Sequence, residues 1–403
     1  MHPILDTENR YSANNYLPLP VVLVKGEGCY LWDINGKQYL DMMSAYSAVS
    51  HGHCHPVLVE ALTKQAQQLC VCSRAFYSDK LAPFLEYACE LIGLDKAIPM
   101  NSGAEAVETA VKVVRKWGYV AKGIPDNQAE IIVLEGNFHG RTTTVISFSS
   151  EPQYRQCFGP LTPGFKCIPY GDADALENAI SANTAAFLVE PIQGESGIRV
   201  PPSGYLKKCA EICAANNVLF ISDEVQTGLG RTGKMLACQH EDVKPDGVIL
   251  GKALGGGLLP VSMFLARSEV MDVLNPGDHG STFGGNPLAA TIGLTALRTL
   301  VNENMVANSA ELGSYFLKAL SAIKSPLIKE VRGKGLFIGV EIDTRKVSAR
   351  DVCLQLIEDG LLTKDTHGTV IRLCPPLVVT RAQIDEALRI IKHSLAEIER
   401  VIG

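Results

Sequence analysis

The chain has 403 residues, of which 46% are hydrophobic and 20% are charged, and its formal net charge is −6. This length and apolar content are sufficient for a sizeable core in about two or three domains. The negative charge argues against a nucleic-acid surface or a polybasic membrane surface, and no apolar run is long enough for a membrane-spanning helix.

The twelve cysteines are scattered through apolar or helical patterns. The chain starts with neither an apolar secretory signal nor an arginine-rich transit peptide, so we expect reduced, buried thiols. The run His51-Gly52-His53-Cys54-His55 is a candidate metal site, but no second cluster with suitable spacing accompanies it. We therefore expect no metal.

Residues 1–44 are expected to form an N-terminal arm and a small β unit that joins the small domain. The runs 21–24, 29–33 and 38–40 are typical of strands, and Asn35-Gly36 is typical of the hairpin turn between the last two.

Two helices are predicted next, one over 56–69 and one that begins after Ser102. Ser102 and Glu105 fit a capping box at the start of the second helix. Its apolar positions share one face: Val107, Ala110, Val111 and Val114. Backbone N–H groups at such a glycine-containing start can bind a phosphate, although an ordinary capped helix explains these residues equally well.

Apolar strand-like runs then recur, separated in several places by helical patterns such as 202–216. The runs are 130–134, 143–148, 186–189, 218–222 and 248–250. Alternating β and α units of this kind predict an α/β fold with a mainly parallel sheet covered by helices. We assign this large domain to residues 45–287.

From residue 288 the pattern changes to that of a small α+β domain, which we assign to 288–403. The elements expected there are helices over 288–303, 309–324 and 380–402 and strands near 329–332 and 336–340.

Two of the predicted strands end in polar side chains. The run 248–250 is followed by Gly251 and Lys252, and the run 218–222 is followed by Asp223. A lysine amine can form a Schiff base with a carbonyl, and open α/β sheets bind ligands at the carboxyl ends of their strands. Taken singly, a surface lysine and a capping aspartate are the alternatives. Together, the amine and the carboxylate are the two fixed points of a pyridoxal phosphate site.

A nucleotide-binding loop at Gly251-Lys252 is the other explanation of that stretch. The phosphate-loop pattern needs a glycine five residues before the Gly-Lys pair and a serine or threonine after it. The chain has Asp246 and Ala253 at those positions, so we reject this explanation.

Six motifs, in order along nearly the whole chain, resemble the class III (ω-amino acid) aminotransferases of pyridoxal phosphate fold type I. They are Asn101–Ala106, Asn137–Arg141, Glu190–Glu195, Ser222–Gly228, Leu250–Ala253 and Gly280–Pro287. The resemblance implies a pyridoxal phosphate-dependent transaminase whose large domain contains a seven-stranded, mainly parallel sheet.

Within this family, four stretches resemble the ornithine δ-aminotransferases: Tyr11–Pro20, Ser44–Val49, Ser73–Tyr77 and Thr366–Arg372. His139 departs from that subgroup, which commonly carries tryptophan or a similar ring at this position. The chain also lacks the mitochondrial leader of eukaryotic relatives, which implies a cytoplasmic enzyme.

On the cofactor side, the resemblance implies that Lys252 binds pyridoxal phosphate covalently and then carries the proton, while Asp223 keeps the pyridine nitrogen protonated. Phe138 would stack on the ring, with His139 packed nearby and Gln226 close to the ring oxygen. The implied phosphate contacts are Ser102, Gly103 and Ala104 of the same subunit, together with Thr282 of the partner subunit. The active site would therefore lie at a homodimer interface.

On the substrate side, the resemblance implies five residues: Tyr16, Tyr46, Arg141, Glu195 and Arg372. Arginine suits carboxylates because its planar fork pairs with both oxygens, and a dicarboxylic acceptor needs two such contacts, from Arg141 and Arg372. Glu195 is implied to pair with Arg372 while ornithine is bound and to move away for 2-oxoglutarate.

The expected reaction transfers the δ-amino group of L-ornithine to 2-oxoglutarate, giving L-glutamate and glutamate 5-semialdehyde, which feeds proline metabolism. One alternative is another ω-transaminase acting on N-acetylornithine or 4-aminobutyrate. Tyr16 and Tyr46 argue against it, because they suit a free α-amino acid head group. A decarboxylase or racemase on the same scaffold is the other alternative. We expect neither a nucleic acid nor a membrane as a partner.

Overall fold

The computed structural model describes residues 3–402, so residues 1–2 and 403 of the predicted terminal regions lie outside the described residues. Its largest sheet has seven strands in the order β4-β10-β9-β8-β7-β5-β6. Strand β10 is antiparallel to both of its neighbours, and the other strand pairs are parallel. This confirms the predicted mainly parallel sheet. The strands are β4 (Lys96–Met100), β5 (Glu130–Leu134), β6 (Phe165–Ile168), β7 (Thr184–Val189), β8 (Leu219–Asp223), β9 (Gly247–Leu250) and β10 (Ser262–Ala266).

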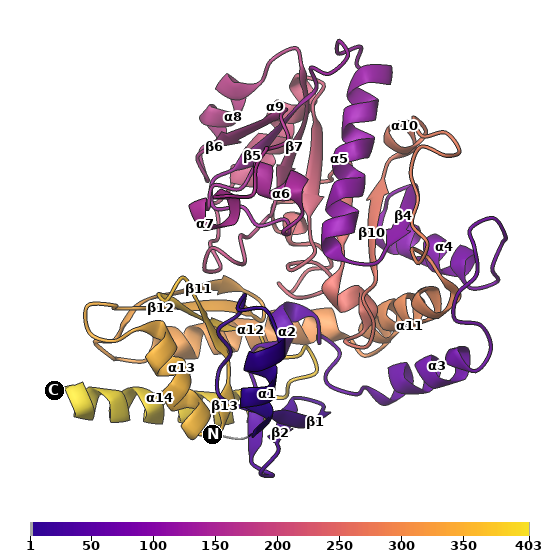
Figure 1. The fold of residues 1–403 in the computed structure, drawn as a ribbon. Coiled ribbons are helices and arrows are strands. Elements are labelled where there is room, and N and C mark those ends of the chain that lie inside the picture. The colour runs from indigo at the N-terminus through magenta and orange to yellow at the C-terminus, as the bar shows by residue number, and fades with distance from the viewer. Residues whose placement is uncertain (1–2, 403) are drawn as a thin grey trace.

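Helices cover both faces of this sheet, as Figure 1 shows. Along β5, Ile131 and Val133 belong to the apolar cluster of α5 (Gly103–Val120), whereas Ile132 and Leu134 belong to that of α4 (Leu81–Ile92) and α9 (Tyr205–Ala215). Because both faces are buried, these strands are continuously apolar rather than alternating. The other helices of this region are α3 (Pro56–Ala66), α6 (Thr143–Ser147), α7 (Pro152–Arg155), α8 (Ala173–Ala179) and α10 (Ser268–Met271), with 3-10 turns η1 (Ala237–Glu241) and η2 (Lys252–Gly255).

Two smaller sheets bring the beginning and the end of the chain together. One is antiparallel and consists of β11 (Ile328–Lys334), β12 (Phe337–Ile342), β15 (Val370–Leu373) and β14 (Lys364–Thr366). The other contains β1 (Leu23–Glu27), β2 (Tyr30–Asp33), β3 (Gln38–Asp41) and β13 (Leu361–Leu362), and β13 runs parallel to β3. In Figure 1 the indigo N-terminal elements accordingly lie beside the orange and yellow C-terminal ones.

The remaining helices pack against these sheets or connect them to the large one. They are α1 (Pro3–Tyr11), α2 (Ser44–Ser47), α11 (Pro287–Asn302), α12 (Met305–Ser321), α13 (Ala349–Glu358) and α14 (Arg381–Ile402). Helices α11, α12 and α14 confirm the helices predicted at 288–303, 309–324 and 380–402, with ends that differ by a few residues.

One predicted strand is wrong. The run 143–148 forms the helix α6 instead. It is rich in β-branched residues, which favour strands. The Thr142 side chain accepts a hydrogen bond from the Val145 backbone N–H and so caps a helix at this point. The sequence prediction also omits β4, β6 and β10. Strand β4 contains Pro99 and lies at the edge of the sheet, where a strand tolerates proline.

Candidate active site

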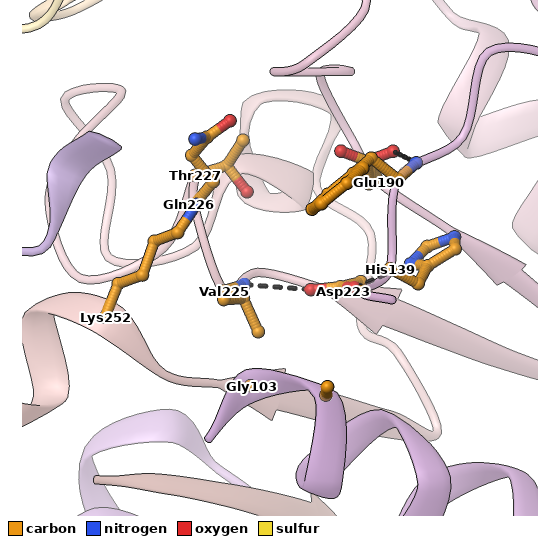
Figure 2. Close-up of a pocket in the computed structure, with 11 residues that line it drawn as sticks. Gly103, His139, Glu190, Asp223, Val225, Gln226, Thr227 and Lys252 are labelled. Carbon is orange, nitrogen blue, oxygen red and sulfur yellow. Dashed lines mark hydrogen bonds and ion pairs between the residues drawn. The ribbon is translucent and has the colours of Figure 1, made fainter. Parts of the chain in front are cut away.

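A pocket lies at the carboxyl ends of the parallel strands β5, β7, β8 and β9. The first turn of α5 closes it from below in the view of Figure 2. Its position follows from the parallel arrangement, because the loops after neighbouring parallel strands meet at one edge of the sheet. The lining residues are Gly103, Ala104, Phe138, His139, Gly140, Glu190, Asp223, Val225, Gln226, Thr227 and Lys252.

Lys252 enters the pocket from the turn after β9. Its backbone φ is +44°, and it starts the short 3-10 turn η2. Figure 2 shows the side chain extended toward Gln226. Loss of hydration lowers the pKa of the amine and outweighs the opposite effect of the Glu195 carboxylate. A larger neutral fraction makes this amine a better nucleophile and a better base.

Asp223 is the last residue of β8 and is almost completely buried. One carboxylate oxygen accepts a hydrogen bond from the Val225 N–H at 3.0 Å, and the other lies 2.6 Å from Nδ1 of His139. Burial alone would lower the pKa of His139, but the bond to Asp223 prevails and raises it. The opposite ring nitrogen, Nε2, is buried and has no hydrogen-bond partner within residues 3–402. The His139 ring therefore holds the Asp223 side chain in place at the end of β8.

Glu190 is a third buried polar group at this edge of the sheet, and the sequence interpretation assigned no role to it. It directly follows β7, and its carboxylate accepts hydrogen bonds from the backbone N–H groups of Phe138 at 2.9 Å and Gly194 at 3.4 Å. Burial raises the pKa of Glu190 to about 7, against the lowering effect of His139. The sequence did contain a signal for Glu190, because an acidic residue at the end of an apolar strand also indicated Asp223 as a site residue.

The predicted substrate residues Glu195, Arg372 and Tyr46 converge beside this pocket. Arg372 lies in β15, and its guanidinium is 2.8 Å from the Glu195 carboxylate. Its central carbon lies 4.7 Å from the centre of the Tyr46 ring. Burial alone would raise the pKa of Glu195, but Arg372 and Lys252 outweigh it and lower that pKa. The Gln226 amide donates to the same carboxylate at 3.3 Å, which links the ion pair to the cofactor pocket.

Arg141 lies at the outer side of the pocket and is exposed. Its central carbon is 3.5 Å from the ring centre of Tyr154 and 5.5 Å from that of Phe138. The two rings meet edge to face at 6.1 Å. Tyr154 is an aromatic neighbour that the sequence interpretation missed, since the short helix α7 that carries it has no functional motif.

The comparisons with known proteins agree along nearly the whole chain. The family model for class-III aminotransferases matches residues 11–395. The chain belongs to the class-III aminotransferases. The ornithine aminotransferase of Halalkalibacterium halodurans is 54% identical over 392 residues, which span 97% of this aminotransferase and 98% of that protein.

Two solved structures extend this likeness to the fold. The ornithine aminotransferase of Toxoplasma gondii, a structure with partial occupancy of pyridoxal phosphate at its active site, has a TM-score of 0.97 and 45% identity. The match covers 98% of this aminotransferase and 94% of that chain. The acetylornithine aminotransferase of Elizabethkingia anophelis has a TM-score of 0.89 and 50% identity, with 98% of each chain covered.

Class-III aminotransferases use pyridoxal phosphate, and the donor set of the pocket fits this cofactor. Lys252 offers the amine for the aldehyde, Asp223 offers a buried carboxylate for the ring nitrogen, and Phe138 offers a ring for stacking. The start of α5 lies against the pocket, and a Cβ at Gly103 would lie 3.0 Å from the Val225 side chain, so glycine suits this close approach. Gly103 and Ala104 therefore present first-turn backbone N–H groups, which bind phosphate readily.

Seven predicted site residues do not line this pocket. Four of them belong to the substrate side described above: Tyr46, Arg141, Glu195 and Arg372. The other three are Ser102, Thr282 and Tyr16. Ser102 caps α5, and both its N–H and its hydroxyl donate to Glu105, which confirms the predicted capping box. Thr282 is exposed in the loop before α11, and its contact with a partner's cofactor stays a prediction. Tyr16 is 77% exposed in the N-terminal arm, and its contact with substrate likewise stays a prediction.

The described part of the chain also bears on the predictions about membranes and metals. Within residues 3–402, no helix is long and apolar enough to cross a membrane. In the same part of the chain, no three His, Cys, Asp or Glu side chains cluster as metal ligands. His51 donates from Nε2 to the Ala296 carbonyl oxygen of α11 at 2.9 Å, and His53 pairs with Asp41 at 2.7 Å.

Proposed function

We propose that this aminotransferase transfers the δ-amino group of L-ornithine to 2-oxoglutarate, giving L-glutamate and glutamate 5-semialdehyde. The single observation that carries the choice of substrates is the ion pair between Glu195 and the buried Arg372, 2.8 Å apart beside the cofactor pocket. A free arginine there would attract the α-carboxylate of any amino acid. The paired arginine leaves this region neutral, as a δ-amine donor requires.

Bound pyridoxal phosphate would supply an aldehyde to carry the amino group between the two substrates and an electron-withdrawing ring. The Lys252 amine would be the base that removes a proton from the δ-carbon of ornithine and would then donate that proton to the cofactor. Asp223 holds the proton on the pyridine nitrogen, and His139 holds Asp223 in place through the 2.6 Å bond.

The acceptor half of the cycle makes the opposite demand. The carbonyl carbon of 2-oxoglutarate carries a carboxylate directly beside it, so this substrate needs a free arginine near the reacting carbon. We assign that role to Arg372, released when the Glu195 side chain moves, and we assign the distal carboxylate to Arg141. One pocket thereby accepts two unlike substrates because a single ion pair opens and closes.

Most of the relatives support ornithine as the donor, and one of them makes N-acetylornithine the second candidate. The 54% identical protein from H. halodurans is an ornithine aminotransferase, whereas the E. anophelis structure at 50% identity is an acetylornithine aminotransferase. N-acetylation removes the positive charge of the α-amino group. Tyr16 and Tyr46 suit a charged, free α-amino acid head group better, and we therefore favour ornithine.

We also propose a homodimer in the cytoplasm, with Thr282 of the partner subunit at the phosphate. Exposed aromatic side chains support the interface: Phe76 is 71% and Phe283 55% exposed. Arg74 and Ser281, close to these rings in the sequence, line one surface pocket. Sedimentation velocity of the purified protein checks the dimer.

We further propose the domain division 1–44, 45–287 and 288–403.

The decisive test of the reaction is a donor panel. Ornithine, N-acetylornithine, 4-aminobutyrate and lysine are each supplied with 2-oxoglutarate, and glutamate formation is measured. Ornithine is expected to give the highest kcat/KM, with glutamate 5-semialdehyde as product and no release of carbon dioxide. N-acetylornithine as the best donor would contradict the proposed substrate, and carbon dioxide release would contradict the reaction class.

A further inference from the structure

The short segment that carries Tyr46 has an unusual backbone. Four consecutive residues, Ser44 to Ser47, have positive φ angles of 44°, 46°, 60° and 73°. None of them is glycine. Side chains make this left-handed region unfavourable, so single residues adopt it more readily than a run does. A run of this kind persists only where its surroundings hold it in place.

This left-handed turn places Tyr46 in the substrate region. The Tyr46 ring lies 4.7 Å from the central carbon of Arg372, and the Tyr46 carbonyl oxygen accepts a hydrogen bond from Gln226 at 3.4 Å. Gln226 also contacts Glu195. A change in the turn would therefore move the Tyr46 ring away from the Arg372 guanidinium.

Arg231 holds both flanks of the left-handed turn. Its side chain is completely buried. One terminal nitrogen, Nη2, donates to the Ser44 hydroxyl at 3.3 Å and to the Ser50 hydroxyl at 3.0 Å. The other, Nη1, donates to the backbone carbonyls of Leu336 at 3.0 Å and Pro375 at 2.5 Å. The guanidinium thus joins the turn to the segments that precede β12 and follow β15.

The same contacts connect the turn with the strand of Arg372. Pro375 lies three residues beyond Arg372, and the Ser44 hydroxyl donates to the carbonyl of the intervening Cys374 at 2.7 Å. Asp41 supports the beginning of the turn, where its carboxylate accepts the N–H groups of Met43 and Ser44. Tyr46 and Arg372 are therefore set against each other through one buried polar network centred on Arg231.

We infer that Arg231 is a positioning residue for donor recognition: by holding the left-handed turn Ser44–Ser47, it sets the Tyr46 ring against Arg372. This inference rests on the proposed function for the choice of donor. Only a planar fork can reach the four acceptors at once, since a lysine ammonium has three donors on a single nitrogen. Arg231 contacts neither the cofactor pocket nor Arg372 itself, so its effect passes through Tyr46.

The test is Arg231→Lys, which keeps the positive charge and loses the fork. Steady-state rates are measured per bound cofactor, so that loss of folded protein does not enter the result. The KM for ornithine is expected to rise at least tenfold, with kcat changing less than threefold. A purely structural role for Arg231 would lower the yield of holoenzyme and leave KM per active site unchanged.

A second substitution tests whether the turn itself is the cause. Ala45 is exposed and has a φ of +46°, so Ala45→Gly removes the left-handed penalty without loss of packing. Combined with Arg231→Lys, it is expected to restore KM to within threefold of wild type. Ala48→Gly is the matched control, because Ala48 has an ordinary φ of −72° and should restore nothing.

Ser50→Ala removes one acceptor of Arg231 and carries the test if the lysine variant does not fold. It is expected to raise KM in the same direction by about threefold. A KM within 1.5-fold of wild type in the variant that folds, or a rise that Ala45→Gly does not reverse, would overturn the inference. If wild type itself prefers another donor in the panel, the proposed substrate fails, and the same variants are compared with that donor.

Discussion

The two ends of the active site are built in different ways. The cofactor end takes its polar side chains from positions directly after strands of one sheet: Glu190 after β7, Asp223 at the end of β8 and Lys252 after β9. The substrate end combines Tyr46, Glu195 and Arg372, which come from segments far apart in the chain. The first arrangement depends on one rigid sheet, and the second depends on how separate sheets are held together.

The two ends also handle buried charge differently. At the cofactor end, His139 lies between two acids and bonds directly to Asp223. At the substrate end, a single ion pair neutralises Arg372, and we propose that this pair opens when 2-oxoglutarate binds. The cofactor end should therefore respond to substitution with loss of rate, and the substrate end should respond with loss of selectivity.

The largest effect is expected for Lys252→Ala. The variant keeps the fold but loses the amine that binds the cofactor and moves the proton, so kcat should fall by about 10³-fold or more, at the upper end of general base contributions. Steady-state assays with ornithine and 2-oxoglutarate measure this. Borohydride treatment followed by peptide mass spectrometry should find the cofactor on the Lys252 peptide of wild type. A turnover rate of the variant close to that of wild type would contradict a catalytic role for Lys252.

The next largest effect is expected for Asp223→Asn. The amide keeps the shape but carries no charge to hold the proton of the pyridine nitrogen, so the rate should fall by about 10²-fold, in the range of other electrostatic catalytic groups. The measurement is the single-turnover rate of the ornithine half-reaction. A loss smaller than tenfold would mean that this carboxylate only caps the Val225 N–H.

Glu190→Gln should change the pH dependence of stability. Because burial raises the pKa of Glu190 from 4.5 to about 7, folded protein keeps a proton that the unfolded chain loses as pH rises through this window. The free energy of unfolding of wild type should therefore fall by up to about 3 kcal/mol as the pH rises from 4.5 to 7, because of this one carboxyl group. The glutamine cannot titrate, so urea unfolding at pH 5 and pH 8 should differ less in the variant. The other ionisable groups are the same in both proteins, and identical pH dependence would show that Glu190 stays charged.

The smallest effect in rate, and the one that sharpens the comparison, is expected for Glu195→Ala. Removal of the carboxylate frees Arg372, so the 2-oxoglutarate half-reaction should be unchanged or faster. Transamination at the α-amine of ornithine and of other α-amino acids should rise by about tenfold, because the free arginine attracts their α-carboxylates. Single-turnover rates of both half-reactions decide this. Retained strict selectivity for the δ-amine would leave orientation to Tyr16 and Tyr46 alone.

Local patterns determined much of the cofactor end by themselves. The ends of β8 and β9 follow from short apolar runs that stop at Asp223 and Gly251, and the start of α5 follows from the capping box of Ser102 and Glu105. These signals are local, since burial of a strand and capping of a helix depend on neighbouring residues. The parallel order of the sheet then brings the strand ends together.

Tertiary structure alone decided the rest. Residues 143–147 form a helix that the Thr142 side chain caps, although their β-branched composition favours a strand. Arg231 sits in a loop, and only the packing of two sheets buries it against Ser44, Ser50 and Pro375. The left-handed turn that carries Tyr46 contains no glycine, so the sequence gives no signal of its positive φ angles. Its conformation is imposed by distant hydrogen bonds, and sequence patterns describe only what neighbouring residues favour.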